Sequence, residues 1–168
     1  MLASWVADRD QFEELCRQLH GAPWLALDTE FHRESSYYSE FCLLQVASPT
    51  QVALVDVLAI ESLEPLWNLL SRPNATTIIH AAFQDLEIIY QRSGCLPPVV
   101  FDTQLAAALL GWGDQVGYGP LVERLCGKVL SKTSARTNWR QRPLTPEQIE
   151  YAADDVRYLG GIFSLQTQ

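Results

Sequence analysis

The sequence predicts one α/β domain, in which helices pack against a mixed β-sheet. Short apolar or β-branched runs, typical of strands, alternate with segments whose apolar residues recur at helical spacing. The turn Ser48-Pro49-Thr50-Gln51 lies between two such runs and indicates an antiparallel hairpin, so the sheet is not purely parallel. The 168 residues contain no internal repeat, low-complexity tract or linker, and we expect a single domain over residues 1–168.

The elements follow from start and stop signals along the chain. A first helix is expected to begin at Asp8, a good N-cap residue, and to end at Gly21. Strands are expected at 24–30, 42–47, 52–57, 76–80 and 99–101. Further helices are expected from Ser62 to before Pro73, at about 82–92, from a cap at Asp102 to Leu110, at about 119–126, and from Thr145 to about 165. The glycine-rich segment 111–119 follows a helix, not a strand, and is interpreted as a connection.

The run Trp24–Phe31 is apolar on both faces and then carries two acids, Asp28 and Glu30. Such a run is typical of a central, fully covered strand. Side chains at i and i+2 of a strand point to the same face, so the two carboxylates lie side by side. Like charges held that close need a shared proton or a cation, which favours a divalent metal site. A strand that simply meets a polar loop is an equally good alternative for this motif alone.

Two further acids fall at the edge of a buried helical stripe. Asp85 lies three residues after Ala82 and four before Ile89, whereas Glu87 is turned toward solvent. A carboxylate on a core-facing edge needs a partner, although a helix N-terminus or a cap would also suffice.

In the last helix, Asp154 shares the polar face with Glu150 and Arg157. Its neighbour Asp155 lies one turn after Tyr151, at the border of the buried side. The alternative for these two residues is a surface acid and a core tyrosine. Four acids from three elements could instead hold two Mg²⁺ or Mn²⁺ ions that activate water and stabilise the leaving oxygen in phosphoryl transfer.

The composition is that of an ordinary soluble globular protein, with 48% apolar and 19% charged residues. No apolar run approaches the ~18–20 residues of a membrane span, and the first residues lack a basic leader. The four scattered cysteines are expected to be reduced structural thiols, not zinc ligands. We therefore expect a cytoplasmic protein with no membrane partner.

The net charge of −8 argues at first against a nucleic-acid partner. However, two divalent cations at the four acids would offset half of it, and half of the twelve basic residues lie within 124–142. These are Arg124, Lys128, Lys132, Arg136, Arg140 and Arg142. This stretch is a candidate contact for an RNA backbone, with Trp139 available for stacking between Arg136 and Arg140. An exposed charged connection is the alternative, and Phe31 could either stack on a terminal base or belong to the core.

Three segments resemble the exonuclease motifs of the DEDD superfamily, and in more detail those of the ribonuclease D family. They are Asp28-Thr29-Glu30-Phe31, the stretch His80 to Glu87, and Tyr151-Ala-Ala-Asp-Asp155, whose tyrosine is typical of the tyrosine subclass. Supporting segments are Phe101-Asp102-Thr103-Gln104 and residues 134–145. The likeness extends from about residue 5 to about residue 165. Each motif is weakly specific alone, but the set in this order is highly specific.

The resemblance implies a ribonuclease H-like fold with a five-stranded mixed sheet flanked by helices. It implies a 3′→5′ exoribonuclease that trims RNA 3′ ends, typically tRNA precursors, and releases nucleoside 5′-monophosphates. It also implies that Asp28, Glu30, Asp85 and Asp155 bind two metal ions and that Tyr151 positions the attacking water. The alternatives are a single-stranded DNA exonuclease and a catalytically silent RNA-binding module.

The family usually continues into helical HRDC domains that help to bind RNA, whereas this sequence stops at Gln168. We expect the catalytic domain alone, as a fragment or a naturally short form, and favour a monomer. His32 and His80 are interpreted as structural or substrate-side groups, because the expected ligands are all oxygens.

Overall fold

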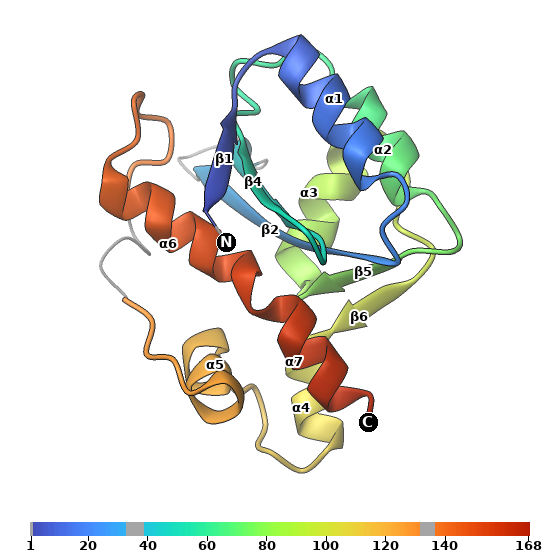
Figure 1. Cartoon of the computed structure of the whole chain (residues 1–168), viewed down its shortest axis with the longest axis vertical. Helices are drawn as coiled ribbons and strands as arrows, with labels where there is room; N and C mark the ends of the chain where they lie inside the picture. The colour runs from blue at the N-terminus through green and yellow to red at the C-terminus, as the bar shows by residue number, and fades with distance from the viewer. Residues whose placement is uncertain (1, 33–38, 132–136) are drawn as a thin grey trace.

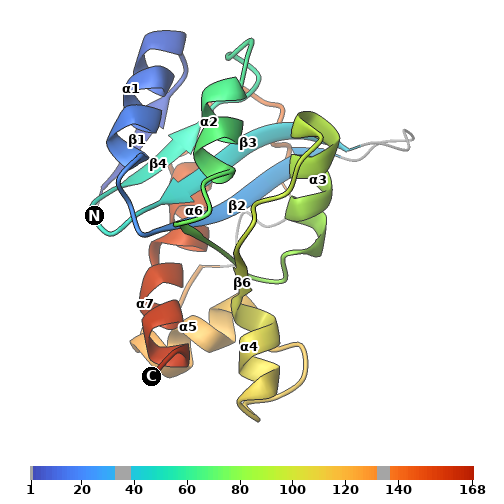
Figure 2. The same ribbon diagram turned by 90° about the vertical axis from the view of Figure 1, so that its right-hand side faces the viewer.

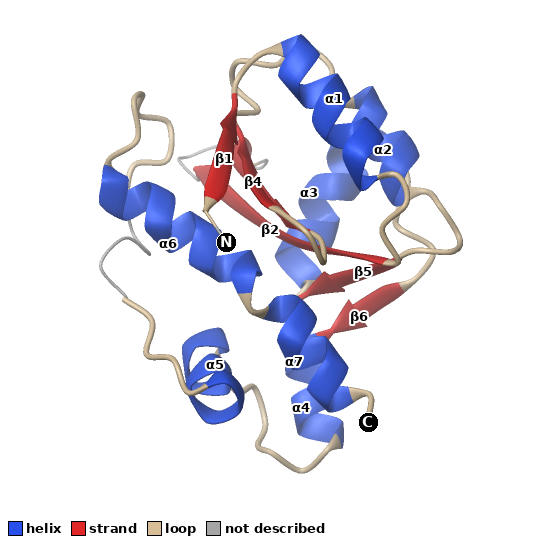
Figure 3. Ribbon diagram, viewed as in Figure 1, coloured by secondary structure: helices blue, strands red, loops and turns tan. Residues whose placement is uncertain are grey.

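In the computed structural model, residues 2–32, 39–131 and 137–168 are described, and they form a six-stranded mixed sheet with helices on both faces (Figures 1 and 3). The strands are β1 (Ala3–Val6), β2 (Trp24–His32), β3 (Glu40–Ala47), β4 (Val52–Val55), β5 (Thr76–Ile79) and β6 (Val100–Asp102). The helices are α1 (Arg9–Leu19), α2 (Glu64–Leu70), α3 (Phe83–Ser93), α4 (Thr103–Leu109), α5 (Tyr118–Cys126), α6 (Pro146–Arg157) and α7 (Leu159–Gln166). None of the helices among these residues is long and apolar enough to cross a membrane.

The sheet has the order β1-β4-β3-β2-β5-β6, which places β2 near its centre. Helices α1, α2 and α3 cover one face, and α6 and α7 cover the other (Figure 2). Leu25 and Leu27 pack toward α1–α3, while Ala26 between them packs toward α6. Burial on both faces confirms that the run after Trp24 is a central, covered strand.

The sheet has one strand more than the predicted five. The additional strand, β1, pairs in parallel with β4 at the edge of the sheet, from Ala3 opposite Val52 to Val6 opposite Val55. Only Val6 of its four residues is buried. An edge strand this short and this exposed has no apolar alternation by which the sequence could reveal it.

The predicted last helix is two helices, α6 and α7, with a break at Tyr158. Its predicted start is confirmed, since Thr145 and Gln148 form a reciprocal capping box. The break lies beside Gly160, where a Cβ atom would collide with the indole of Trp24. This close approach allows the second half of the segment to pack on β2 and β5.

The carboxyl end of β2 extends beyond its neighbour β5. The parallel pairing of the two strands covers only Trp24–Ala26, opposite Thr76–Ile78. On its other edge β2 stays paired with β3 as far as His32, with an irregularity between Glu30 and Phe31. The residues of β2 after Ala26 are therefore not paired with β5, and they lie between the helix layers that contain α3 and α6.

Candidate metal centre

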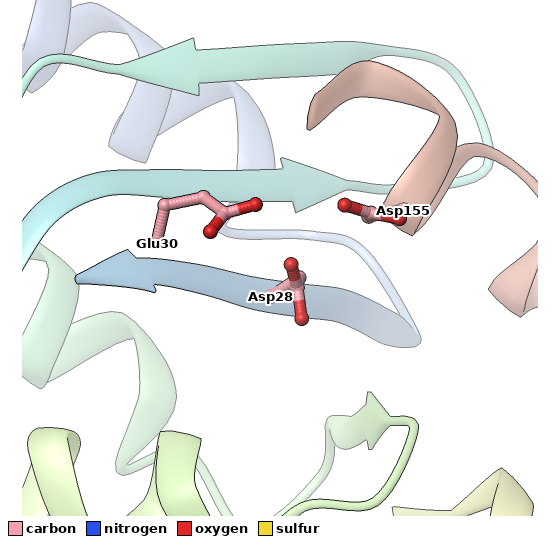
Figure 4. A group of neighbouring side chains, drawn as sticks. All are labelled: Asp28, Glu30 and Asp155. Carbon is pink, nitrogen blue, oxygen red and sulfur yellow. The ribbon is translucent and has the colours of Figure 1, made fainter. Parts of the chain in front are cut away.

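Three acids meet at the carboxyl end of β2. Asp28 and Glu30 come from β2 and Asp155 comes from α6, and their ligand oxygens all lie within 4.8 Å of one another. The three side chains converge on one point in Figure 4. All three are partly buried. The structure thus brings together the strand pair and one of the two helix acids that the sequence singled out.

Asp28 has a second neighbour that the sequence analysis missed. Gln45 of β3 lies opposite Asp28 in the antiparallel register, and its Nε2 donates to Asp28 Oδ2 at 3.3 Å. Gln45 is fully buried, and its Oε1 accepts no hydrogen bond from the described residues. A polar amide inside the apolar run of β3 was the available signal, because buried polar groups normally have partners.

Asp85 comes to the site from the other helix layer. It lies in the first turn of α3 and is only 6% exposed, as its helical phase predicted. Its Oδ1 accepts a 2.6 Å hydrogen bond from the hydroxyl of Thr29, the residue between Asp28 and Glu30. Asp85 is not among the acids whose oxygens lie within 4.8 Å of one another. Its charge nevertheless acts on Asp28 and Glu30, whose pKa values it raises.

The four carboxyl groups are difficult to ionise together. Burial, followed by the charges of Asp85, Asp155 and Glu30, raises the pKa of Asp28 well above its usual range. Burial and the same kind of repulsion raise the pKa of Glu30 to about 9 and that of Asp155 to about 8. Burial raises the pKa of Asp85 to about 6, against the opposing effect of the Thr29 hydrogen bond.

A divalent cation would relieve this repulsion. The donors are carboxylate oxygens from two elements, which suits Mg²⁺ or Mn²⁺ better than the softer metals that prefer sulfur or imidazole. The residues present therefore fit a hard cation.

The adjacent acids of α6 have different environments. Asp154 forms an ion pair with Arg157, which also binds Glu150 at 2.6 Å. Asp155 instead faces Asp28 and Glu30. Helical phase therefore separated the acid that pairs with Arg157 from the acid that faces the β2 pair, although Asp154 is itself partly buried. The hydroxyl of Tyr118 donates to the main-chain carbonyl of Asp154 at 2.7 Å and so ties α5 to this turn.

Tyr151 lies one turn before Asp155 and is half-buried. Burial, and then the charges of Asp155, Glu30 and Asp28, raise the pKa of its phenol above the ordinary value. Its hydroxyl therefore lies within the field of the acid cluster and is protonated at neutral pH. The ring of Tyr151 lies 6.1 Å from that of Trp139, centroid to centroid.

The expectation that Trp139 stacks on RNA is wrong. Trp139 is 3% exposed and belongs to the core between the sheet and α6. Arg142 accounts for this, because its guanidinium binds both carboxylate oxygens of Asp56 and the carbonyl of Cys42, which holds the segment against the sheet. Arg142 is consequently not available to an RNA backbone.

The other proposed RNA contacts have mixed outcomes. Arg140 is exposed and forms an ion pair of 3.0 Å with Glu40. Phe31 is half-buried and packs against the core under α1–α3, in agreement with its structural alternative. The guanidinium of Arg124 donates a hydrogen bond to the main-chain carbonyl of Trp112 and also lies over the Trp112 ring. Lys132 and Arg136 lie outside the described residues.

Comparisons with known proteins identify the family of this chain. Residues 3–165 match the model of a family described as 3′-5′ exonuclease. The chain is 42% identical, over 92% of its length, to a protein named Ribonuclease D from Nitrobacter hamburgensis. It covers only 41% of that relative, so it spans about two fifths of the relative's length.

Two solved structures are also similar. The crystal structure of Escherichia coli RNase D, described as an exoribonuclease involved in structured RNA processing, has a TM-score of 0.96 and 38% identity. The match covers 99% of this chain and 44% of that one. The catalytic core of RRP6 from Trypanosoma brucei has a TM-score of 0.91 and 26% identity, over 99% of this chain and 46% of that one.

Proposed function

The chain belongs to the 3′-5′ exonuclease family, and on this premise we propose that it removes nucleotides from the 3′ ends of RNA by hydrolysis. Water attacks the phosphorus of the last phosphodiester, the bond to the 3′ oxygen breaks, and a nucleoside 5′-monophosphate leaves. The shortened RNA keeps a free 3′ hydroxyl for the next cycle. The observation that carries this proposal is the convergence of Asp28, Glu30 and Asp155, together with the hydrogen bond that joins Asp85 to Thr29 between the two β2 acids.

We propose that these acids hold two divalent cations, Mg²⁺ or Mn²⁺. Asp28 is central to the cluster, since the charges of Asp85, Asp155 and Glu30 all act on it, and it is the best candidate to bridge the two ions. Bound cations of this kind lower the pKa of water and stabilise the charge that develops on a leaving oxygen.

Tyr151 is proposed to orient the attacking water. Its phenol stays protonated at neutral pH, because burial and the neighbouring acids raise its pKa. A protonated hydroxyl can donate one hydrogen bond and accept another, so it can fix the direction of a water molecule without becoming charged. The packing of Trp139 against the tyrosine ring restricts the positions that this hydroxyl can take.

RNA is the preferred substrate class in this proposal. The support is the similarity to a protein named Ribonuclease D and to the E. coli RNase D structure, whose printed description concerns RNA processing. Precursors of tRNA with extra 3′ residues are the proposed natural substrates. Single-stranded DNA is the competing substrate, and RNA binding without cleavage is the competing function.

One digestion experiment separates these possibilities. RNA and DNA oligonucleotides of the same sequence, labelled at the 5′ end, are incubated with the chain in Mn²⁺ or in EDTA. A ladder that shortens from the 3′ end of RNA, only with the metal and only when the 3′ hydroxyl is free, is expected. Faster shortening of DNA than of RNA would instead indicate a DNA exonuclease. Binding of RNA without shortening would reject hydrolysis. A tRNA carrying a 3′ trailer then tests the narrower substrate.

A further inference from the structure

Asp102 accepts hydrogen bonds from four main-chain N–H groups at the starts of two helices. As the predicted N-cap of α4, its Oδ1 accepts from Gln104 at 2.8 Å and from Leu105 at 3.3 Å. The same oxygen accepts from Ala81 at 3.0 Å, and Oδ2 accepts from Ala82 at 2.9 Å. The sequence predicted only the cap of the helix that follows Asp102. The bonds to Ala81 and Ala82 join α4 to the start of α3.

The sheet topology brings these groups together. Strands β5 and β6 are parallel, and Asp102 lies opposite Ile79 at their common carboxyl end. The chain leaves β5 after Ile79 and enters α3 at Phe83. The N-cap position of α3 is Ala82, which has no side chain that could accept a hydrogen bond. Asp102, on the neighbouring strand, instead holds the two residues that lead into α3, because it accepts from the N–H groups of Ala81 and Ala82.

The entry to α3 is also strained. Ala81 has φ +55°, in the left-handed region that residues with a Cβ atom rarely adopt. Such a conformation persists only where surrounding interactions enforce it. The hydrogen bond from the Ala81 N–H to Asp102 is an interaction of this kind.

This strained entry leads directly to a site acid. Asp85 lies in the first turn of α3, three residues after Ala82. The carboxylate of Asp85 accepts a 2.6 Å hydrogen bond from the hydroxyl of Thr29 in β2. The direction in which α3 starts therefore sets the distance between Asp85 and Asp28. A helix released from Asp102 would start in a relaxed conformation and move Asp85 away from the cluster.

We propose that Asp102 is a positioning residue, which holds Asp85 at the metal centre by anchoring the strained start of α3. This inference rests on the proposed exonuclease function, but it can be tested without nuclease activity. Asp102 itself contacts neither the substrate nor the acid cluster in this proposal, although its charge contributes to the raised pKa of Asp85.

The matched control is another helix cap. Asp8 caps α1 through one hydrogen bond, from the N–H of Gln11 at 2.9 Å, and α1 carries none of the site residues. Asp102→Ala and Asp8→Ala both remove an N-cap and are both expected to lower Tm. Only the first should disturb the site. If Asp102→Ala does not fold, Asp102→Asn replaces it, since the amide retains one acceptor oxygen and loses the other.

Three quantities are measured on the whole chain, well below the Tm of each variant. Asp102→Ala is expected to lower kcat on a single-stranded RNA about tenfold or more with KM nearly unchanged, because small misplacements of catalytic groups are costly. Its affinity for Mn²⁺, measured by calorimetry, should fall as well. Hydrogen exchange should accelerate in residues 79–86. Asp8→Ala should change none of the three.

A rescue variant separates positioning from general stability. Glycine adopts positive φ without strain, so Ala81→Gly in the Asp102→Ala background should restore part of kcat and of the Mn²⁺ affinity. The proposal is overturned if Asp102→Ala changes kcat and Mn²⁺ affinity no more than Asp8→Ala does. If the wild-type chain cleaves no nucleic acid, the exonuclease proposal fails, and Mn²⁺ affinity with hydrogen exchange still decides the role of Asp102.

Discussion

The hydroxyl of Thr29 donates a 2.6 Å hydrogen bond to Asp85 Oδ1, which connects the central strand to a helix on the opposite side of the sheet from α6. Asp28 and Glu30 flank Thr29 and point to the α6 side, where Asp155 meets them. The three residues 28–30 therefore reach both helix layers, Thr29 toward α3 and its two neighbours toward α6. The alternation of a strand makes this possible, because neighbouring side chains point to opposite faces.

Removing the Thr29 hydroxyl should weaken both the fold and the proposed reaction. Thr29→Val leaves the buried carboxyl group of Asp85 without its donor, and a hydrogen bond to a charged group contributes about 1.5–3 kcal/mol. The hydrogen bond lowers the pKa of Asp85, so its loss should raise that pKa further. We expect a lower Tm in denaturation experiments and an acidic limb of the kcat profile displaced to higher pH. Thr29→Ser keeps the donor and should show neither change.

The metal-free chain should lose stability as the pH rises. The pKa values of Asp85, Asp155 and Glu30 are raised to about 6, 8 and 9, above the values of about 4 for unfolded carboxyl groups. The folded state therefore binds more protons than the unfolded state in this window, and its free energy of unfolding falls from about pH 4 toward pH 9. Urea denaturation in EDTA at several pH values measures the slope.

The control for this slope is Glu30→Gln, which removes the group with the pKa of about 9. Its stability should fall less steeply between neutral pH and pH 9 than that of the wild type. Equal slopes for the two chains would show that the acid cluster does not cause the dependence.

Neutralising the central acid should stabilise the metal-free chain and abolish stabilisation by metal. Asp28→Asn removes a carboxyl group whose ionisation is opposed by burial and by the charges of Asp85, Asp155 and Glu30, so its Tm in EDTA at about pH 8 should exceed that of the wild type. Mn²⁺ at 100 times Kd should add about 2.7 kcal/mol to the wild type by linkage. The variant should gain almost nothing. Equal Mn²⁺-induced shifts in Tm would remove Asp28 from the site.

Tyr151→Phe should impair the chemical step selectively. It removes the hydroxyl near the acids but keeps the ring that packs beside Trp139. We expect kcat to fall roughly 10²-fold, the lower end for a positioned proton-handling group, with KM and Mn²⁺ affinity nearly unchanged. Single-turnover digestion measures the chemical step. A variant with normal kcat would leave Tyr151 a purely structural role.

The candidate acids could be singled out from the sequence because local geometry marks them, whereas their role as metal ligands came from the family resemblance. Strand alternation pairs Asp28 with Glu30, and helical phase separates Asp85 from Glu87 and Asp155 from its neighbour. These rules need no knowledge of distant contacts. Burial of Asp85 and the convergence of Asp155 on the β2 acids agree with them.

The features that sequence reasoning missed depend on contacts between distant segments. The break before α7 lies beside the close contact of Gly160 with Trp24, and the buried Trp139 lies in the segment that Arg142 joins to Asp56. A tryptophan among arginines is compatible both with a loop that contacts RNA and with a segment held against the core by ion pairs. The sequence alone therefore could not decide between the two. The second role of Asp102 likewise requires the pairing of β6 with β5.

Calorimetric titration with Mn²⁺ near neutral pH tests the central claim, that Asp28, Glu30 and Asp155 form a cation site. The wild type should bind Mn²⁺ and release protons, because its raised carboxyl pKa values of about 8 and 9 keep protons at the site until the cation displaces them. Asp155→Asn should bind about tenfold more weakly or worse and release fewer protons. Equal affinity and equal proton release in the two chains would contradict the claim.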